Sequence, residues 1–178
     1  KSMKRLAGII LSVTLVSACS CFAKDTSGAN PFSATLAAVP AAELPAKAAD
    51  MVSQAKPKDR KATTIGVVKA AVDINPAAAP AIVGAIAQAV PKMASIAAAV
   101  AAEKQPKQAS LIAKAAAAAA PSQVGSIVTA VCRVAPKDYW DIAVAVSQVV
   151  PNANKEIVKA VESALPELKP SVDKVVTR

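Results

Sequence analysis

The most constraining feature of this 178-residue chain is a series of prolines spaced fifteen residues apart. Seven of the 13 prolines share this phase: Pro76, Pro91, Pro106, Pro121, Pro136, Pro151 and Pro166. Proline in the middle of a helix costs about 3 kcal/mol. At the first helical position, however, its missing N–H is not needed and its φ already suits the helix. The spacing therefore predicts that each proline marks the start of a short helix in a fifteen-residue repeat.

Two columns of mostly aliphatic residues follow the prolines in the same phase. Six residues after each proline stand Ile82, Ala97, Ile112, Ile127, Ile142, Ile157 and Val172, and ten residues after it stand Ile86, Ala101, Ala116, Val131, Val146, Val161 and Val176. Positions four apart lie on one side of an α-helix. Each unit is therefore predicted to be one amphipathic helix of about 12 residues, joined to the next by a connection of two to four residues.

Composition favours an all-α fold over any architecture that contains strands. The chain holds 44 Ala and 54% apolar residues, but only 2% aromatic residues, whereas strands prefer β-branched and aromatic side chains. Short helices are marginal alone, and short connections make successive helices antiparallel neighbours. We expect an array of short antiparallel helices, either α-solenoid-like or a compact helical stack. Ser122, Asp138 and Asn152 lie where they could cap first-turn amides.

The chain divides into three segments. Residues 1–23 have the pattern of a secretory signal, with Lys4 and Arg5 before an apolar stretch and small residues after it. Cleavage could follow Ala23, or the lipobox-like residues 16–19 could make Cys19 a lipidated first residue. A membrane anchor is the alternative, because the uncharged stretch continues to Ala23. Residues 24–40 are expected to be an irregular lead, and residues 41–178, with a further helix from Pro45, the helical-repeat domain.

The inventory of reactive groups argues against an enzyme. The chain has no His, which removes the commonest general base and the commonest metal ligand. Ser53 and Lys56 match an S-x-x-K spacing that would place both on one helix face, but no companion motif accompanies them. Asp138 and Asp141 are better explained by their place at a helix start than by a metal. We therefore predict no catalytic residue, metal site or cofactor.

Basic residues give the first candidate for an interaction site. The net charge is +9, and removal of residues 1–23 would leave 18 positive and 12 negative charges, or +6. The densest cluster contains Lys56, Lys58, Arg60 and Lys61. It could meet an anionic partner, although a solvated loop is the simpler interpretation. Nucleic acid is not expected, because the repeats lack an aromatic stacking platform.

Tyr139 and Trp140 are the second candidate, since they are the only aromatic residues in the repeat array. In an Ala-rich stack such bulk most often fills a gap between helices, and a ligand or membrane-interface contact is the alternative. Cys132 is expected to be a small buried residue rather than a functional thiol.

Taken together, these features predict an exported, non-enzymatic helical-repeat protein. It would act as a structural or protein-interaction module in a bacterial periplasm, envelope or extracellular space, with an unidentified protein or envelope partner. Contact with a membrane could come from a lipid on Cys19. The alternative is a peripheral protein that binds lipid surfaces through short amphipathic helices and positive charge. The sequence does not indicate an oligomeric state.

Overall fold

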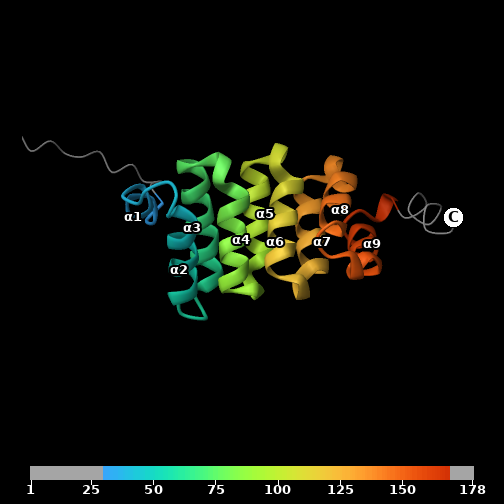
Figure 1. The fold of residues 1–178 in the computed structure, drawn as a ribbon, viewed down its shortest axis with the longest axis horizontal. Helices are drawn as coiled ribbons and strands as arrows, with labels where there is room; N and C mark the ends of the chain where they lie inside the picture. The colour runs from blue at the N-terminus through green and yellow to red at the C-terminus, as the bar shows by residue number, and fades with distance from the viewer. Residues whose placement is uncertain (1–29, 169–178) are drawn as a thin grey trace, which may run out of the picture.

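A computed structural model describes residues 30–168 as an elongated stack of short helices (Figure 1). Within these residues there are nine α-helices and no strand. The α-helices are α1 (Ser33–Ala37), α2 (Leu44–Gln54), α3 (Arg60–Ile74), α4 (Ala79–Ala89), α5 (Ala94–Lys104), α6 (Ala109–Ala119), α7 (Val124–Val134), α8 (Tyr139–Ser147) and α9 (Asn154–Ala164). The all-α repeat predicted from the sequence is confirmed.

Each repeated proline begins a helical unit, as predicted, but the unit starts with a 3-10 turn instead of with an α-helix. The prolines open three-residue 3-10 turns, such as Pro76–Ala78 and Pro91–Met93, which lead directly into the α-helix. A single residue follows each of α3 to α7 and α9 before the next 3-10 turn, instead of the two to four that we expected, whereas three residues (148–150) follow α8. The α-helices from α4 to α7 have 11 residues, so each unit is helical for 14 of its 15 positions.

The residue before each proline is the point where the chain changes direction. These seven residues are Asn75, Val90, Gln105, Ala120, Ala135, Val150 and Leu165, and all have φ between −138° and −122° and ψ between 67° and 87°. Steric conflict with the proline ring pushes the preceding residue out of the helical region. The carbonyl of Gln105, for example, still accepts from the amide of Gln108 at 2.9 Å. One residue is therefore enough to end one helix and start the next.

The expected capping side chains are not used. Between residues 30 and 168, none of the helix N-caps for which a cap is described carries a side-chain hydrogen bond, so the prediction for Ser122, Asp138 and Asn152 is wrong. The 3-10 turn explains the difference. In unit after unit, it supplies a backbone acceptor for the amides that an N-cap side chain would otherwise satisfy.

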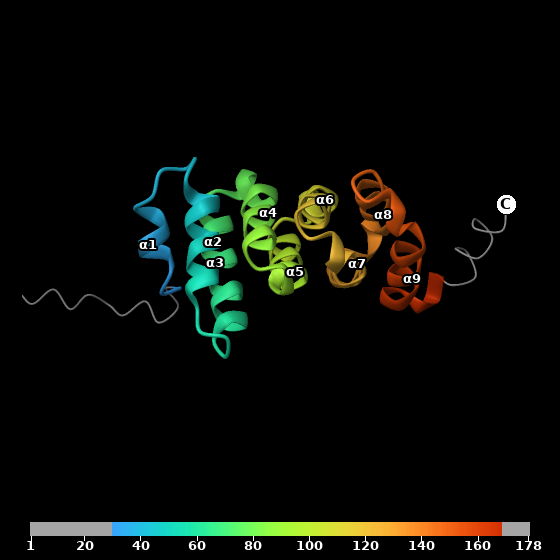
Figure 2. The same ribbon diagram turned by 60° about the horizontal axis from the view of Figure 1, so that its bottom comes forward.

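The helices form two layers, and each packs most closely on the helix two units along the chain. One layer contains α2, α4, α6 and α8, and the other contains α1, α3, α5, α7 and α9 (Figure 2). Consecutive helices lie in opposite layers and contact each other less. The antiparallel neighbours inferred from short connections are therefore present, but the dominant packing partner is the next helix of the same layer.

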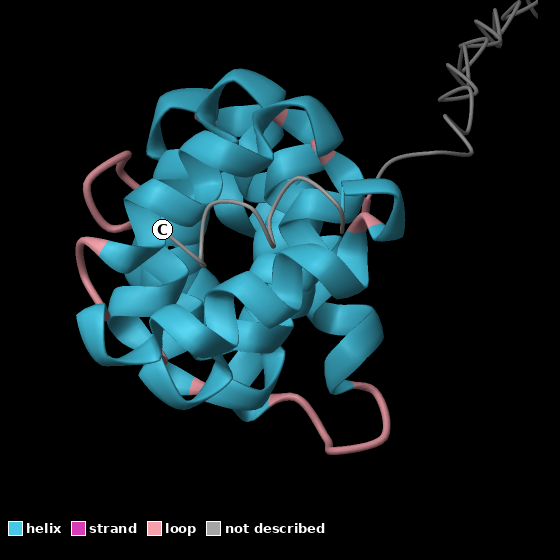
Figure 3. Cartoon of the chain, turned by 90° about the vertical axis from the view of Figure 1, so that its right-hand side faces the viewer, coloured by secondary structure: helices cyan, strands magenta, loops and turns pink. Residues whose placement is uncertain are grey.

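The direction of the helices turns gradually along the stack. In Figure 2 α2 and α3 run across the long axis in the plane of the view, whereas α6 and α7 are seen almost end-on. Figure 3, which looks along the long axis, shows helices crossing in several directions for the same reason. The stack is therefore a twisted solenoid whose core runs between its two layers.

The core is built from the predicted columns. The residues six and ten after each proline are buried throughout the described units, from Ile82 and Ile86 in α4 to Ile157 and Val161 in α9. Alanines complete the packing, and Ala113, Ala116 and Ala117 of α6 have no exposed surface. Small side chains allow helix axes to approach closely, so contact over the backbone substitutes for bulky core residues.

The lead before the repeats is partly helical and lies on the stack. The helix α1 falls within residues 24–40, and its Leu36 is fully buried. Phe32 packs over Gly66 of α3, where an added Cβ would lie 2.5 Å from the ring. The side-chain amide of Asn30 donates to the carbonyl of Gly66. Residues 30–37 therefore cover α3. The expected signal segment, residues 1–23, lies outside the described residues.

Candidate interaction surface

The hydrogen bonds that side chains make over long sequence separations reveal the thirty-residue spacing of the stack. Five hydrogen bonds between residues 60 and 165 join units two apart, over separations of 31 to 34 residues: Lys104 to Asp73, Gln108 to Pro76, Lys114 to Gln148, Gly125 to Glu156 and Thr129 to Ala160. The first is also an ion pair of 2.7 Å at the surface. An exposed pair of this kind contributes about 0–1 kcal/mol. These contacts fix the register between helices of one layer.

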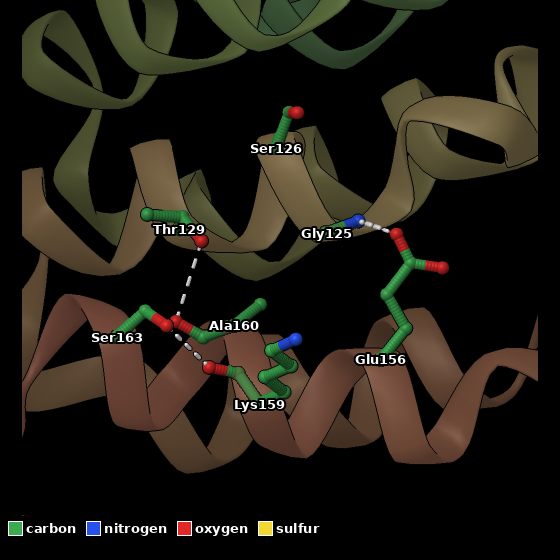
Figure 4. Close-up of a pocket in the computed structure, with 7 residues that line it drawn as sticks. All are labelled: Gly125, Ser126, Thr129, Glu156, Lys159, Ala160 and Ser163. Atoms are coloured by element: carbon green, nitrogen blue, oxygen red, sulfur yellow. Dashed lines mark hydrogen bonds between the residues drawn. The ribbon is translucent and has the colours of Figure 1, made fainter.

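A polar groove lies between α7 and α9 (Figure 4). The Gly125 amide donates to Oε1 of Glu156 at 3.1 Å, and Thr129 Oγ1 donates to the Ala160 carbonyl at 3.3 Å. Ser163 Oγ donates to the Lys159 carbonyl at 2.8 Å, while Ser126 points away from α9. The groove's hydroxyl and carboxylate groups therefore satisfy backbone groups of the two helices.

The polar groove does not assemble a nucleophile with a base. An activated serine needs a general base within hydrogen-bond reach. The Ser163 hydroxyl instead bonds the backbone carbonyl of Lys159, and the Glu156 carboxylate bonds a backbone amide. The bonds of Glu156 and Thr129 tie α7 to α9, and the Ser163 bond lies within α9, so this groove is a structural feature of the stack.

A second groove, between α4 and α6, has the opposite character. It is lined by Pro80, Ala81, Gly84, Ala85, Gln88, Ala115, Ala118 and Ala119, which we call the α4–α6 groove. Its volume is about 570 Å³ and it opens widely to solvent. The whole unit 76–90 contains no charged residue. The floor is formed by small side chains, since Gly84 faces Ala115 and an added Cβ would lie 3.8 Å from the Ala115 Cβ.

Leu111 stands on the same face of α6 as one wall of this groove. It precedes Ala115 by four residues and Ala118 by seven, so the three share one side of the helix. The Leu111 side chain is 55% exposed, although the adjacent Ile112 is fully buried. A large aliphatic residue beside an uncharged groove is the kind of surface that proteins use for contacts with partners.

Sequence reasoning did not find Leu111 or the α4–α6 groove. The available signal was the absence of charge from residues 76–90, but the exposed side of a helix could not be assigned before the packing partner was known. Leu111 lies five residues after its proline, in a column that also holds Ala81, Ser126 and Glu156. That column is exposed in all these units, and only comparison with the structure singles out its one leucine.

The two aromatic residues are placed differently by the structure. Tyr139 is half-buried and packs against the core, as expected for a residue that fills space between helices. Trp140 is 58% exposed, so the preferred interpretation of Trp140 as a gap filler is wrong. The reason is register: Trp140 lies four residues after Pro136, one position beyond the buried column that begins with Ala79 and Ala94.

The basic cluster lies at the turn between α2 and α3. Lys56, Lys58 and Lys61 are exposed, as a solvated loop would be. Arg60 has a structural role, because its guanidinium donates to the carbonyls of Ser53 at 3.3 Å and Ala55 at 3.0 Å. These bonds satisfy acceptors at the C-terminal end of α2. Arg60 is thus a link between two helices rather than part of the freely presented charge.

The remaining chemical motifs are not assembled into sites. The helix α2 ends at Gln54, so Lys56 does not share a helix face with Ser53, whose hydroxyl donates to the Asp50 carbonyl at 2.9 Å. Asp138 and Asp141 lie in the first turn of their unit. In the part of the chain from 30 to 168, no three His, Cys, Asp or Glu side chains gather as metal ligands.

Cys132 is a buried core residue, as the sequence predicts. Its side chain has no exposed surface and the thiol is free. Desolvation by burial raises the pKa of the Cys132 thiol from 9.0 to about 11. The thiol therefore stays protonated and unreactive at neutral pH. Cys19, the predicted lipidation site, lies outside the described residues.

Comparison with family models, with curated proteins and with solved structures finds no match for this chain. Among residues 30–168, no helix combines the length and the apolar character that a membrane crossing requires. The functional argument therefore depends on the surfaces described above.

Proposed function

We propose that this chain is an exported, non-enzymatic helical-repeat module that binds a protein of the cell envelope or extracellular space through the α4–α6 groove. The observation that carries this proposal is the exposure of Leu111 beside a groove without charge. Burial of a leucine side chain contributes about 1.5–3 kcal/mol, which makes Leu111 the natural centre of a contact.

The groove indicates the chemistry of the partner. Its floor of Gly84, Ala85, Ala115 and Ala118 lets a partner backbone approach closely, and it offers no charged side chain to pair with a charged ligand. A helix or extended segment with small or medium aliphatic side chains fits these properties. The opposite layer is more highly charged at its surface, where Lys92, Glu103, Lys104 and Arg133 are exposed. An apolar partner segment is therefore expected to bind on the side of the stack that holds α4 and α6.

Site-specific photo-crosslinking in the native cell tests the partner proposal. A photoreactive residue at Ala118, in the groove, should give one crosslinked protein, while the same residue at Ser126, exposed in the opposite layer, should not. Leu111→Asp should abolish the Ala118 crosslink and leave the helical content unchanged. Equal crosslinking from both positions, or a crosslink that survives Leu111→Asp, would contradict the proposal.

Export and the lack of catalysis are the other parts of the proposal. Export is supported by the signal pattern of residues 1–23 and is tested by the intact mass of the mature protein, which also detects a lipid on Cys19. The non-enzymatic part is supported by the absence of His and by the separated Ser53 and Lys56. A catalytic turnover of the purified protein that is lost in Ser53→Ala would refute it.

The lipid-surface alternative has weaker physical support. The helices would have to open and place their apolar sides on the membrane, but those sides form the core of the stack. Opening α6, for example, would expose the fully buried Ile112, Ala113 and Ala116 before any lipid contact formed. Flotation with anionic vesicles at low salt, using a version that lacks residues 1–23, distinguishes the two. Binding of this version would favour the lipid alternative.

A further inference from the structure

A basic surface lies at the turn between α2 and α3, and the stacking of the helices adds a further lysine to it. Lys56, Lys58 and Lys61 are exposed at this turn. Because α2 packs on α4 and α3 packs on α5, the turn between α4 and α5 lies beside it, along the lower edge of the stack in Figure 1. The α4–α5 turn presents Lys92, which is also exposed. We call these four lysines the basic edge.

The charges of the basic edge are not balanced by acidic side chains. Among residues 30–168 the one ion pair joins Lys104 to Asp73, at the opposite edge of the stack, so no lysine of the basic edge is paired there. Asp59 is the single acidic residue of the α2–α3 turn. Residues 86–92 and 116–123, at the next two turns along the same edge, contain none. This surface therefore favours an anionic partner.

The side chains around the basic edge indicate which kind of anion fits. Arg60, the fifth basic residue, uses its guanidinium for carbonyls at the end of α2. The four lysines are compact single-point cations on flexible stems, which suit carboxylates spaced along a chain. Within residues 30–168 the exposed large hydrophobic side chains lie elsewhere, so neither turn offers the apolar anchor on which peripheral lipid binding relies.

The α4–α6 groove ends at the basic edge. Gln88 and Ala118, which line the groove, lie in the last turns of α4 and α6, and Lys92 follows Gln88 by four residues. The α2–α3 turn begins at the end of α2, which neighbours α4 in the same layer, at an axis separation of about 8–10 Å. About three residues of extended chain span this distance. A segment that leaves the groove at Gln88 therefore reaches the lysines along the surface of the stack.

We propose that the partner segment in the α4–α6 groove continues into an acidic stretch, whose Asp or Glu carboxylates bind the lysines of the basic edge. This inference rests on the proposed function of the groove. It adds the charge of the partner and the direction of its segment, with aliphatic residues against Leu111 and acidic residues beyond Gln88. Charges at the rim of an interface mainly speed association and select among partners. The groove supplies the apolar contact, and the basic edge selects the partner.

Photo-crosslinking from two positions tests the two contacts separately. A photoreactive residue at Ala118 reports on the groove, and one at Ala62, which is exposed beside Lys61, reports on the basic edge. Introduced singly and activated in the native cell, both should crosslink the same protein. The partner peptide attached to position 62 should contain at least two Asp or Glu residues. It should lie within about ten residues of the peptide attached to position 118, because a longer connection is not needed to span two helices.

Removal of charge gives a matched comparison. The test chain loses three charges of the basic edge: Lys56→Gln, Lys58→Gln and Lys92→Gln. The control chain loses three exposed lysines of the α8 and α9 units: Lys137→Gln, Lys155→Gln and Lys159→Gln. The test chain should give a crosslink yield at least about threefold lower at both positions, since three exposed charge contacts are lost together. The control chain, with the same net charge, should keep the yield of the unchanged chain.

The possible results distinguish this inference from the proposed function of the groove. A crosslink from position 118 with no protein attached at position 62, or with a lipid or polysaccharide attached there, would overturn the inference and leave the function of the groove standing. Equal yields from the test and control chains would overturn it in the same way. Absence of the crosslink from position 118 in the unchanged chain would instead remove the proposed function, and this inference with it.

Discussion

The backbone amide of Gly125 in α7 donates a hydrogen bond of 3.1 Å to the Glu156 carboxylate in α9, 31 residues later. A Cβ at position 125 would lie 2.6 Å from the same oxygen, so glycine permits the approach. The carboxylate also lies at the first turn of α7, where the helix dipole favours negative charge. One bond therefore joins two units of the same layer and stabilises the start of a helix.

A double-mutant cycle should measure this coupling. We expect Glu156→Ala to lower the free energy of unfolding by about 0.5–1.5 kcal/mol, the contribution of one hydrogen bond. Gly125→Ala should have little net effect in the natural chain, because lost capping offsets the gain of about 1 kcal/mol in helix propensity. In the Glu156→Ala background the same change should stabilise. Gly84→Ala is the control: its new Cβ finds ordinary contact with Ala115, so it should stabilise by up to about 1 kcal/mol. Additive effects at positions 125 and 156, measured by urea unfolding, would contradict the coupling.

Adjacent residues of α6 should respond very differently to truncation. Ile112 is fully buried and Leu111 is 55% exposed. We expect Ile112→Ala to cost about 2–5 kcal/mol, because it removes a buried side chain and leaves a cavity. Leu111→Ala should change the free energy of unfolding by about 0.5 kcal/mol or less, as other surface substitutions do. Chemical denaturation compares the two variants. Similar losses of unfolding free energy would argue against the described register of α6.

The repeated prolines should matter far less than a proline placed inside a unit. Pro121 opens its unit and is exposed, so Pro121→Ala should cost about 0.4–1 kcal/mol, mainly by loosening the unfolded chain. Ala116→Pro should cost about 3 kcal/mol or more, since it removes a hydrogen bond inside α6 and introduces a clash. Thermal unfolding, monitored by circular dichroism, compares the stabilities of the two variants. A large loss of stability in Pro121→Ala would show that the proline does more than mark the start of a helix.

The buried thiol of Cys132 should make stability depend on alkaline pH. Its pKa in the folded protein is raised to about 11 by burial, above the ordinary value of 9.0. The folded state therefore holds its proton more tightly than the unfolded chain. The resulting stabilisation is complete below pH 9 and is lost as the pH rises through 11, by at most about 1.4 kcal/mol per pH unit.

Cys132→Ala isolates this contribution, because three equivalent positions of the stack, Ala87, Ala102 and Ala117, already hold alanine. The difference in unfolding free energy between the natural chain and Cys132→Ala should be constant up to pH 8 and should shrink between pH 9 and 11. A difference that grows over this interval would have the wrong sign for a thiol protected by burial.

The fold was largely predictable because the prolines that mark the helix starts act only on neighbouring residues. Proline acts on the residue before it and on the first turn after it, so the spacing from Pro76 to Pro166 determines where helices begin. The preference of each helix for the helix two units away was not predictable from short connections. It follows from side-chain size, since columns such as Ala109, Ala113 and Ala117 permit close packing within a layer.

The candidate surface was less predictable because exposure depends on neighbours. Trp140 and Tyr139 are adjacent, yet one is mostly exposed and the other packs against the core. Leu111 and Ile112 show the same contrast. Arg60 belongs to a basic cluster in the sequence, but its guanidinium donates hydrogen bonds to carbonyls at the end of α2. A linear pattern identifies the side chains, whereas the packing of a second helix decides which of them face solvent.

The packing of each unit on the second unit along the chain is tested most directly by an engineered disulfide between positions 84 and 115. A Cβ at position 84 lies 3.8 Å from the Cβ of Ala115, which matches the usual Cβ separation in a disulfide. Gly84→Cys with Ala115→Cys, in a Cys132→Ala chain, should oxidise in air to one crosslink that joins the two peptides in a non-reducing digest. The control pair, Gly84→Cys with Ala99→Cys, joins positions of consecutive units in opposite layers and should stay reduced. A crosslink in the control pair, together with none between 84 and 115, would contradict the two-layer solenoid.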